Sequence, residues 1–328
     1  MVNISHRQRL EICLSGNQPD RPPVSLWRHF PVDDQTPEGL AVAVANFQKQ
    51  YDFDFIKVTP ASSFCVKDWG ATDRWTGNIE GTRDYQQPVI TYPEDWTKLP
   101  LLDPNVGQLG HQLTVLRLLK NEFGSSVPIL QTIFSPLAQA KNLVGKDNLI
   151  LHIRQHPEEL HAGLEIITES TIRFIEEAMK IGIDGIFFAI QHAQYSLLSQ
   201  EEFLIFEKPY DVRVLETTKS LWLNMIHLHG EHIMFDLVAD LPVSIMNWHD
   251  RHTPPSLKEA LERFPGAVCG GLKRWETMVL GTPRDVVREA KDAIQQTGGR
   301  RFILGTGCVL PIIVPHGNIL AARRSIET

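Results

Sequence analysis

Two histidines stand one residue apart where an apolar stretch of the chain ends, in the sequence MIHLHG at positions 225–230. Side chains two residues apart on a β-strand point to the same face, so the imidazoles of His227 and His229 can face the same way. A second apolar stretch, at 301–307, ends in the thiol of Cys308. Imidazole nitrogens and a thiolate are ligands of Zn²⁺, and a catalytic zinc ion keeps its fourth position open. We therefore predict that His227, His229 and Cys308 bind zinc. For a histidine pair of this spacing, the alternative is a set of hydrogen bonds without a metal.

The elements that must position these residues form a regular alternation. Apolar strands are expected at 24–30, 53–59, 127–134, 185–191, 222–229, 242–248, 267–272 and 301–308. Helical patterns occupy 5–15, 36–51, 106–123, 135–144, 148–155, 156–180, 199–219, 231–240, 256–264, 282–297 and 316–327. Strands that alternate with helices indicate parallel βαβ units, and eight such units predict a single (β/α)₈ TIM barrel, an α/β fold.

One stretch does not follow this alternation. Residues 61–105 have little periodicity and contain Trp69, Trp75 and Trp96. Long irregular segments in compact domains are often functional, so we expect an excursion over the barrel mouth. The alternative is a packed surface arm without chemistry. No linker composition interrupts the chain, which predicts one domain over residues 1–328.

Polar residues gather where the predicted strands end, and in TIM barrels this end of the strands holds the active site. Arg28, His192 and Asn247 are the candidate catalytic residues. The candidate substrate-binding residues are Arg28, Phe134, Gln191, His192, Asn247 and His249. We expect Arg28, Gln191, His192, Asn247 and Cys308 to line one cavity. The alternative for His192 and His249 is that they only form the wall of the pocket or make hydrogen bonds. Gln191 and Asn247 could instead form hydrogen bonds with backbone groups of loops.

The composition limits the possible classes of function and the possible cellular location. The 328 residues are 42% hydrophobic and carry a net charge of −7, which disfavours a nucleic-acid partner. Four dispersed cysteines without a CxxC pair do not form a disulfide framework and indicate a reducing, cytoplasmic setting. The first residues lack the apolar core of a signal peptide. No apolar run approaches the ~20 residues of a membrane span, so no membrane association is expected.

Several motifs together identify a family. The chain resembles the uroporphyrinogen decarboxylase superfamily from the opening RPPVSLWR at 21–28 to the closing PHGNI at 315–319. One branch of that superfamily decarboxylates uroporphyrinogen without metal or cofactor. The other holds zinc-dependent methyltransferases that move methyl groups between corrinoids and thiols, with zinc on a His-x-Cys pair and a distant cysteine. The HLHG at 227–230 falls on His-x-Cys-Gly, and Cys308 falls on the distant cysteine. His229 departs from this pattern, because that branch has cysteine there.

The decarboxylase branch is matched less well. Its opening motif has two arginines, of which only the first, Arg28, has a counterpart, and its Leu-Gly-His-Gly is LGTG at 304–307. The resemblance therefore implies a methyltransferase with zinc and with a corrinoid, supplied by a partner protein or as free cobalamin. A small nucleophile such as a thiol would be the substrate, and Arg28 would anchor its anionic group. The resemblance is compatible with a homodimer. A metal-free carboxy-lyase and a non-catalytic corrinoid- or ligand-binding barrel are the alternatives.

Overall fold

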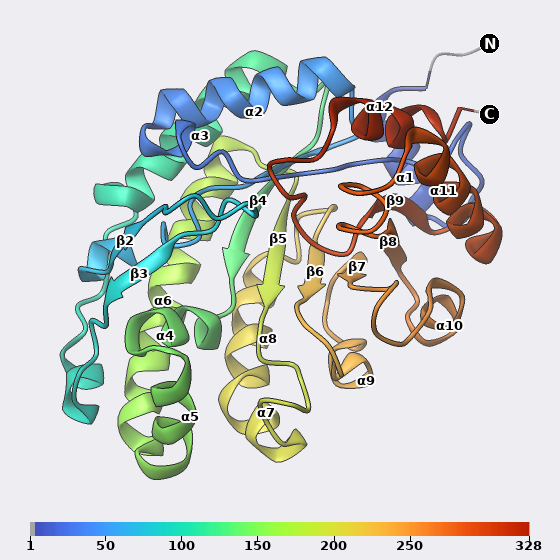
Figure 1. The fold of residues 1–328 in the computed structure, drawn as a ribbon. Helices are drawn as coiled ribbons and strands as arrows, with labels where there is room; N and C mark the ends of the chain where they lie inside the picture. Colours follow the sequence, from blue (N-terminus) through green and yellow to red (C-terminus); the bar gives the residue numbers. More distant parts are fainter. Residues whose placement is uncertain (1–3, 328) are drawn as a thin grey trace.

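A computed structural model describes residues 4–327, and a curved sheet of parallel strands forms its centre (Figure 1). The strand order is β1-β4-β5-β6-β7-β8-β9, so strands that follow one another in this sheet also pair. Their bounds are β1 Ile56–Val58, β4 Ile129–Phe134, β5 Gly185–Ile190, β6 Met225–Leu228, β7 Ile245–Trp248, β8 Ala267–Leu272 and β9 Phe302–Thr306. This architecture confirms the predicted α/β barrel.

The first predicted strand, 24–30, is not a regular strand, which corrects the prediction. It makes isolated parallel bridges, among them Val24 with Leu304 of β9. The N–H of Ser25 donates to the carbonyl of Leu304, and the N–H of Asp54 donates to the carbonyl of Val24. Prolines at 22 and 23 lack N–H donors, so a continuous ladder cannot start there. The segment nevertheless connects β9 with the residues before β1 and closes the barrel.

Helices cover the outside of the sheet, as Figure 1 shows for α6 and α8 beside β4 and β5. Their bounds are α1 His6–Leu14, α2 Pro37–Tyr51, α3 Gly107–Phe123, α4 Pro136–Val144, α5 Lys146–Gln155, α6 Pro157–Ile181, α7 Gln200–Phe206, α8 Lys208–Thr217, α9 Phe235–Val238, α10 Leu257–Arg263, α11 Pro283–Thr297 and α12 His316–Arg324. The hydroxyls of Ser5, Thr36, Ser135, Ser199, Ser256 and Thr282 cap helix N-termini, as the sequence pattern predicts.

Two predicted helices differ from the structure. The helix expected at 199–219 is divided at Glu207 into α7 and α8, because Pro209 in the first turn of α8 has no N–H to continue α7. The helix expected at 231–240 shrinks to α9, because His232 has a φ of 51° and therefore leaves the helical region. No helix within residues 4–327 combines the length and the hydropathy that crossing a membrane requires.

The 61–105 segment has short elements of its own: the 3₁₀ helices η2 (Lys67–Trp69) and η3 (Pro93–Lys98), and an antiparallel hairpin of β2 (Thr72–Arg74) and β3 (Asp84–Gln87). Trp69, Ile90, Trp96 and Leu102 belong to the same hydrophobic cluster as the barrel wall. Trp96 lies so close to α6 that a Cβ at Gly163 would come within 2.4 Å of its ring. The N–H of Ile312, after β9, donates to the carbonyl of Ile79. The segment thus packs against α6 on one side and against the chain leaving β9 on the other.

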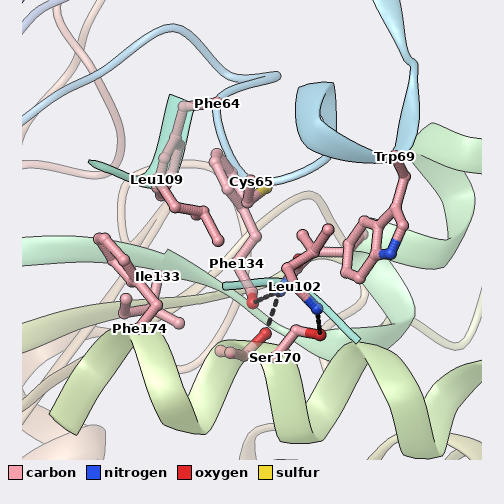
Figure 2. A pocket seen from close by; sticks show the side chains of 11 residues that line it. Phe64, Cys65, Trp69, Leu102, Leu109, Ile133, Phe134, Ser170 and Phe174 are labelled. Carbon is pink, nitrogen blue, oxygen red and sulfur yellow. Dashed lines mark hydrogen bonds between the residues drawn. The ribbon is translucent and has the colours of Figure 1, made fainter. Parts of the chain in front are cut away.

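Figure 2 shows the contact between this segment, β4 and α6. Phe64, Cys65 and Trp69 face Phe134 and Phe174 around a void of about 10 Å³. Such a volume holds about one water molecule. The N–H of Leu102 donates to the Ser170 hydroxyl at 3.2 Å, which fixes the end of the segment on α6. This cavity is a packing seam and is too small for a substrate.

Candidate metal centre

Four side chains from neighbouring strand ends converge at the carboxyl end of the barrel. His227 is in β6, His229 directly follows β6, His249 directly follows β7, and Cys308 lies two residues beyond β9. One potential ligand atom of each lies within 4.8 Å of those of the other three. Sγ of Cys308 is 4.0 Å from Nδ1 of His229. The structure thus brings the three predicted zinc ligands together and adds His249, which we expected only as a substrate-binding residue.

The donor set fits zinc. Nε2 of His227 and Nε2 of His249 are buried and have no hydrogen-bond partner among the residues that the structure describes. A buried polar atom without a partner is costly, and a metal ion would complete both rings. Imidazole nitrogen and thiolate sulfur are the ligand types of zinc, at about 2.0–2.3 Å. Small side-chain rotations would bring the four donors to that distance, so His227, His229, His249 and Cys308 are the residues that would hold the ion.

Electrostatics favour the thiolate that a metal ligand must be. Burial raises the pKa of the Cys308 thiol, but His227, His229 and His249 outweigh this effect and hold that pKa well below its usual value. Burial is also the main reason why the pKa of His227 is lowered, which keeps this imidazole neutral. The thiolate is the form in which a cysteine ligates a metal.

Asn247 orients the ring of His227, and its predicted catalytic and substrate-binding role stays a prediction. It is fully buried. Its amide donates to the carbonyls of Cys269 at 2.8 Å and Thr306 at 3.0 Å. Its Oδ1 therefore accepts from Nδ1 of His227, 2.7 Å away, so the lone pair of that ring lies on Nε2, toward the cluster.

A glycine permits the close approach of the strand ends. A Cβ at Gly307 would lie 2.6 Å from Cα of His249 and 2.7 Å from the carbonyl oxygen of Trp248. Only a residue without a side chain can pass this point, and Cys308 follows directly. The GTGC sequence at 305–308 is thus what allows the chain after β9 to reach the end of β7.

Arg28 does not line a cavity with Cys308, which corrects that prediction. Its guanidinium carbon lies 5.1 Å from the ring of Phe30 and 5.3 Å from the ring of Phe47 in α2. Its Nη1 donates to the carbonyl of Ile312 at 3.2 Å. Trp27 belongs to the cluster of inward-facing residues, and Arg28, the next residue, points to the helical layer. The alternation of side chains along an extended segment is the physical reason.

The other residues predicted to share one cavity lie in different places. Phe134 and Gln191 line a cavity of about 610 Å³ between the β2–β3 hairpin, β4 and α4. His192 does not line it: only 3% of this residue is exposed, and its Nδ1 faces Oε2 of Glu207 at 3.7 Å. The single cavity expected for these residues does not form. Whether any of them acts in catalysis or binds a substrate stays a prediction.

Two lysines near the mouth, the buried Lys57 and the half-buried Lys141, were not singled out from the sequence. Lys57 lies in the middle of β1 with its Nζ 4.5 Å from the ring centroid of Phe187, and the Phe187 ring lies 5.3 Å from Trp27 and 5.4 Å from His227. Burial lowers the pKa of Lys57 to about 7. Lys141 in α4 lines the 610 Å³ cavity. The one signal for Lys57 was a charge inside the apolar run FDFIKVT, at 53–59.

Behind His192, Glu207 and Asp211 are fully buried, and within residues 4–327 their carboxylate oxygens have no partner at hydrogen-bond geometry. Burial raises the pKa of both carboxyls, so the folded protein retains protons that the unfolded chain releases above about pH 4.3. Stability must therefore fall as pH rises from that value toward the raised folded pKa. We expect Glu207→Gln to remove one such proton and to make the protein more stable than wild type at pH 8, by roughly 1–3 kcal/mol.

Urea denaturation between pH 5 and pH 9 measures this effect. Glu201→Gln, at an exposed glutamate in α7, the helix that ends just before Glu207, is the matched control and should follow the wild-type curve. A Glu207→Gln curve that runs parallel to wild type at every pH would contradict the assignment.

Comparisons with known proteins identify the family of the chain. A model of the uroporphyrinogen decarboxylase (URO-D) family matches residues 30–328. The methylcobamide:CoM methyltransferase MtbA of Methanosarcina acetivorans is 23% identical over 245 residues, which are 71% of this chain and 69% of that protein. The methylated-thiol–coenzyme M methyltransferase of Methanosarcina mazei is 23% identical over 265 residues, 80% of this chain and 68% of that protein.

Solved structures show the same fold. A methyltransferase from Methanosarcina mazei superimposes with a TM-score of 0.86 at 18% identity over 99% of both chains. A B12-independent methionine synthase from Shewanella sp. W3-18-1, in complex with selenomethionine, has a TM-score of 0.61 at 13% identity over 94% of both chains. The resemblance inferred from the sequence motifs is confirmed: the chain belongs to the uroporphyrinogen decarboxylase (URO-D) family.

Proposed function

We propose that this chain is a zinc-dependent methyltransferase that moves a methyl group between a corrinoid and a small nucleophile. The observation that carries the proposal is the convergence of His227, His229, His249 and Cys308, with two buried ring nitrogens that lack a hydrogen-bond partner in the described part of the chain. The names of the relatives support the reaction class, because both act as methyltransferases on coenzyme M. When bound, zinc lowers the pKa of a coordinated nucleophile and favours its anion at neutral pH.

The residues of the chain prepare this site in distinct ways. Asn247 holds the His227 ring by one hydrogen bond, so the ring presents the same nitrogen to the cluster at all times. Phe187 stacks on His227 with ring planes 22° apart and shields that side of the cluster from water. His229, His249 and Cys308 are accessible in part, which leaves an approach from the mouth of the barrel. The corrinoid would be presented from that side by a partner protein or as free cobalamin.

Metal analysis together with a methyl-transfer assay tests the proposal. We expect stoichiometric zinc in protein purified without chelators. Demethylation of methylcobalamin, followed by its absorbance spectrum in the presence of a panel of small thiols and alcohols, should depend on that zinc. Removal of the metal by a chelator should abolish the reaction, and added zinc should restore it. A zinc-free preparation that decarboxylates a porphyrinogen would overturn the proposal in favour of the carboxy-lyase branch.

A further inference from the structure

The 610 Å³ cavity lies next to the metal cluster. In the parallel register of β5 and β6, Ile190 is opposite Leu228. The N–H of His229 donates to the carbonyl of Ile190 at 3.0 Å, so Gln191 and His229 leave neighbouring strands side by side. Neighbouring strands are about 4.8 Å apart. The wall of the cavity that contains Gln191 is therefore about one strand spacing from a residue of the cluster.

The charges around this cavity are positive. Arg83, Lys141 and Lys146 line it, and none of its described lining residues has a carboxylate, in a chain whose net charge is −7. Arg83 is neutralised by a close ion pair with Asp34. Lys141 differs: within residues 4–327 it forms no ion pair, and its Nζ donates to the neutral Oε1 of Gln191 at 2.7 Å.

Lys141 is a half-buried cation on the cavity lining, and within residues 4–327 it has no counterion. Burial lowers the pKa of its ammonium group to about 8, so the charge is still present at neutral pH. The nearby thiol of Cys65 gives no compensation, because burial raises the pKa of that thiol to about 12 and keeps it neutral. A buried charge is costly unless a group of opposite charge pairs with it. An anion in the cavity would provide this pairing.

We propose that the cavity binds the carboxylate of an organic acid through Lys141, and that this acid is the small-molecule substrate of the metal centre. The second half of this inference rests on the proposed function. The volume is within the roughly 300–1,000 Å³ of ordinary small-molecule pockets, so the acid has a body much larger than two carbons. Tyr85 and Phe134 offer aromatic surface to that body, and the adjacent Gln191 leads from the carboxylate toward His229.

Benzoate and benzamide are the probes, because they share a ring and differ in charge. We expect benzoate to bind wild-type protein at least about tenfold more tightly than benzamide, as a charge-assisted hydrogen bond predicts. Lys141→Met should remove this preference, and Lys141→Arg should retain it because the charge stays. Lys98→Met changes an exposed lysine in η3 and should behave as wild type. Calorimetric titration of the full-length protein measures each affinity, and circular dichroism checks the fold of each variant.

The Cys308→Ser variant separates this inference from the metal site. Benzoate should bind that variant as well as it binds wild type, because the carboxylate is held by Lys141. Loss of benzoate binding in Cys308→Ser would mean that the carboxylate ligates the metal, which overturns the cavity assignment. Equal or undetectable binding of the two probes by wild type, or undiminished benzoate binding by Lys141→Met, would overturn it too. A negative zinc or methyl-transfer assay with benzoate still selected by Lys141 would instead overturn the proposed function, and with it the role of the acid as substrate, while the carboxylate site would stand.

Discussion

Replacement of Cys308 by serine is expected to remove zinc and methyl transfer together. Cys308 supplies the sole sulfur of the cluster, and the three other potential ligands are imidazole nitrogens. A serine hydroxyl is a poor zinc ligand at neutral pH because it stays protonated. Loss of groups that only support metal ligands already costs about 10–100-fold in affinity, so loss of the thiolate should cost about 100-fold or more. Metal content after dialysis and the rate of methylcobalamin demethylation measure the two effects.

A second cysteine gives a matched control for this prediction. Cys13 in α1 is fully buried, and its thiol donates to the carbonyl of Phe302 at 3.4 Å, a bond that a serine hydroxyl can also make. Cys13→Ser should therefore keep full zinc occupancy and full activity. Full zinc occupancy in Cys308→Ser would show that the four side chains are a hydrogen-bonded group and not a metal site.

The sequence was most informative where periodicity and chain order decide the structure. Parallel strands that follow one another must end at the same face, so the alternation predicted that His227, His229 and Cys308 come together. The same rule would have added His249 to the cluster, because it directly follows β7, between β6 and the strands leading to Cys308. A strand position alone does not say whether a histidine faces the metal or the wall, and for this reason His249 was assigned to the substrate.

Side-chain direction and depth were the properties that the sequence did not give. Arg28 and Trp27 are adjacent in a segment without regular strand pairing, so which of them points inward depends on a register that no pattern in the sequence fixes. Asparagine is a residue type that can bind a substrate, but the side chain of Asn247 already makes three hydrogen bonds inside the protein. The sequence pattern predicts that the helix containing Lys141 lies on the outside of the barrel. That the Nζ of Lys141 lies beside Gln191 is visible only in the structure.

Asp54 shows how much stability depends on one residue that no sequence pattern indicated. Its carboxylate is fully buried at the amino end of the barrel and accepts hydrogen bonds from Arg9 and Arg21, each at 2.7 Å, and from the N–H of Val24 at 2.8 Å. It thereby joins α1 and the irregular segment at 23–28 to the chain that enters β1. His6 is a further partner, 3.1 Å away.

Asp54→Asn is therefore expected to destabilise the fold by about 3–5 kcal/mol, because two arginines lose their common buried counterion. Asp20→Asn is the matched control: Asp20 also pairs with Arg9, but its side chain is 40% exposed, so about 1 kcal/mol or less is expected. Guanidinium denaturation at pH 7 measures both, and a loss of less than about 1 kcal/mol in Asp54→Asn would contradict the assignment.

The pH dependence gives an independent check. Burial raises the pKa of Asp54, but His6 and Arg21 outweigh it and hold that pKa well below its usual value. A carboxyl with a depressed folded pKa contributes stability above its unfolded pKa of about 3.9 and loses this contribution as pH falls toward the folded value. The stability difference between wild type and Asp54→Asn should thus be constant from pH 5 to 7 and shrink below pH 4. A difference that stays constant down to pH 2 would show that the variant loses packing and not the buried charge.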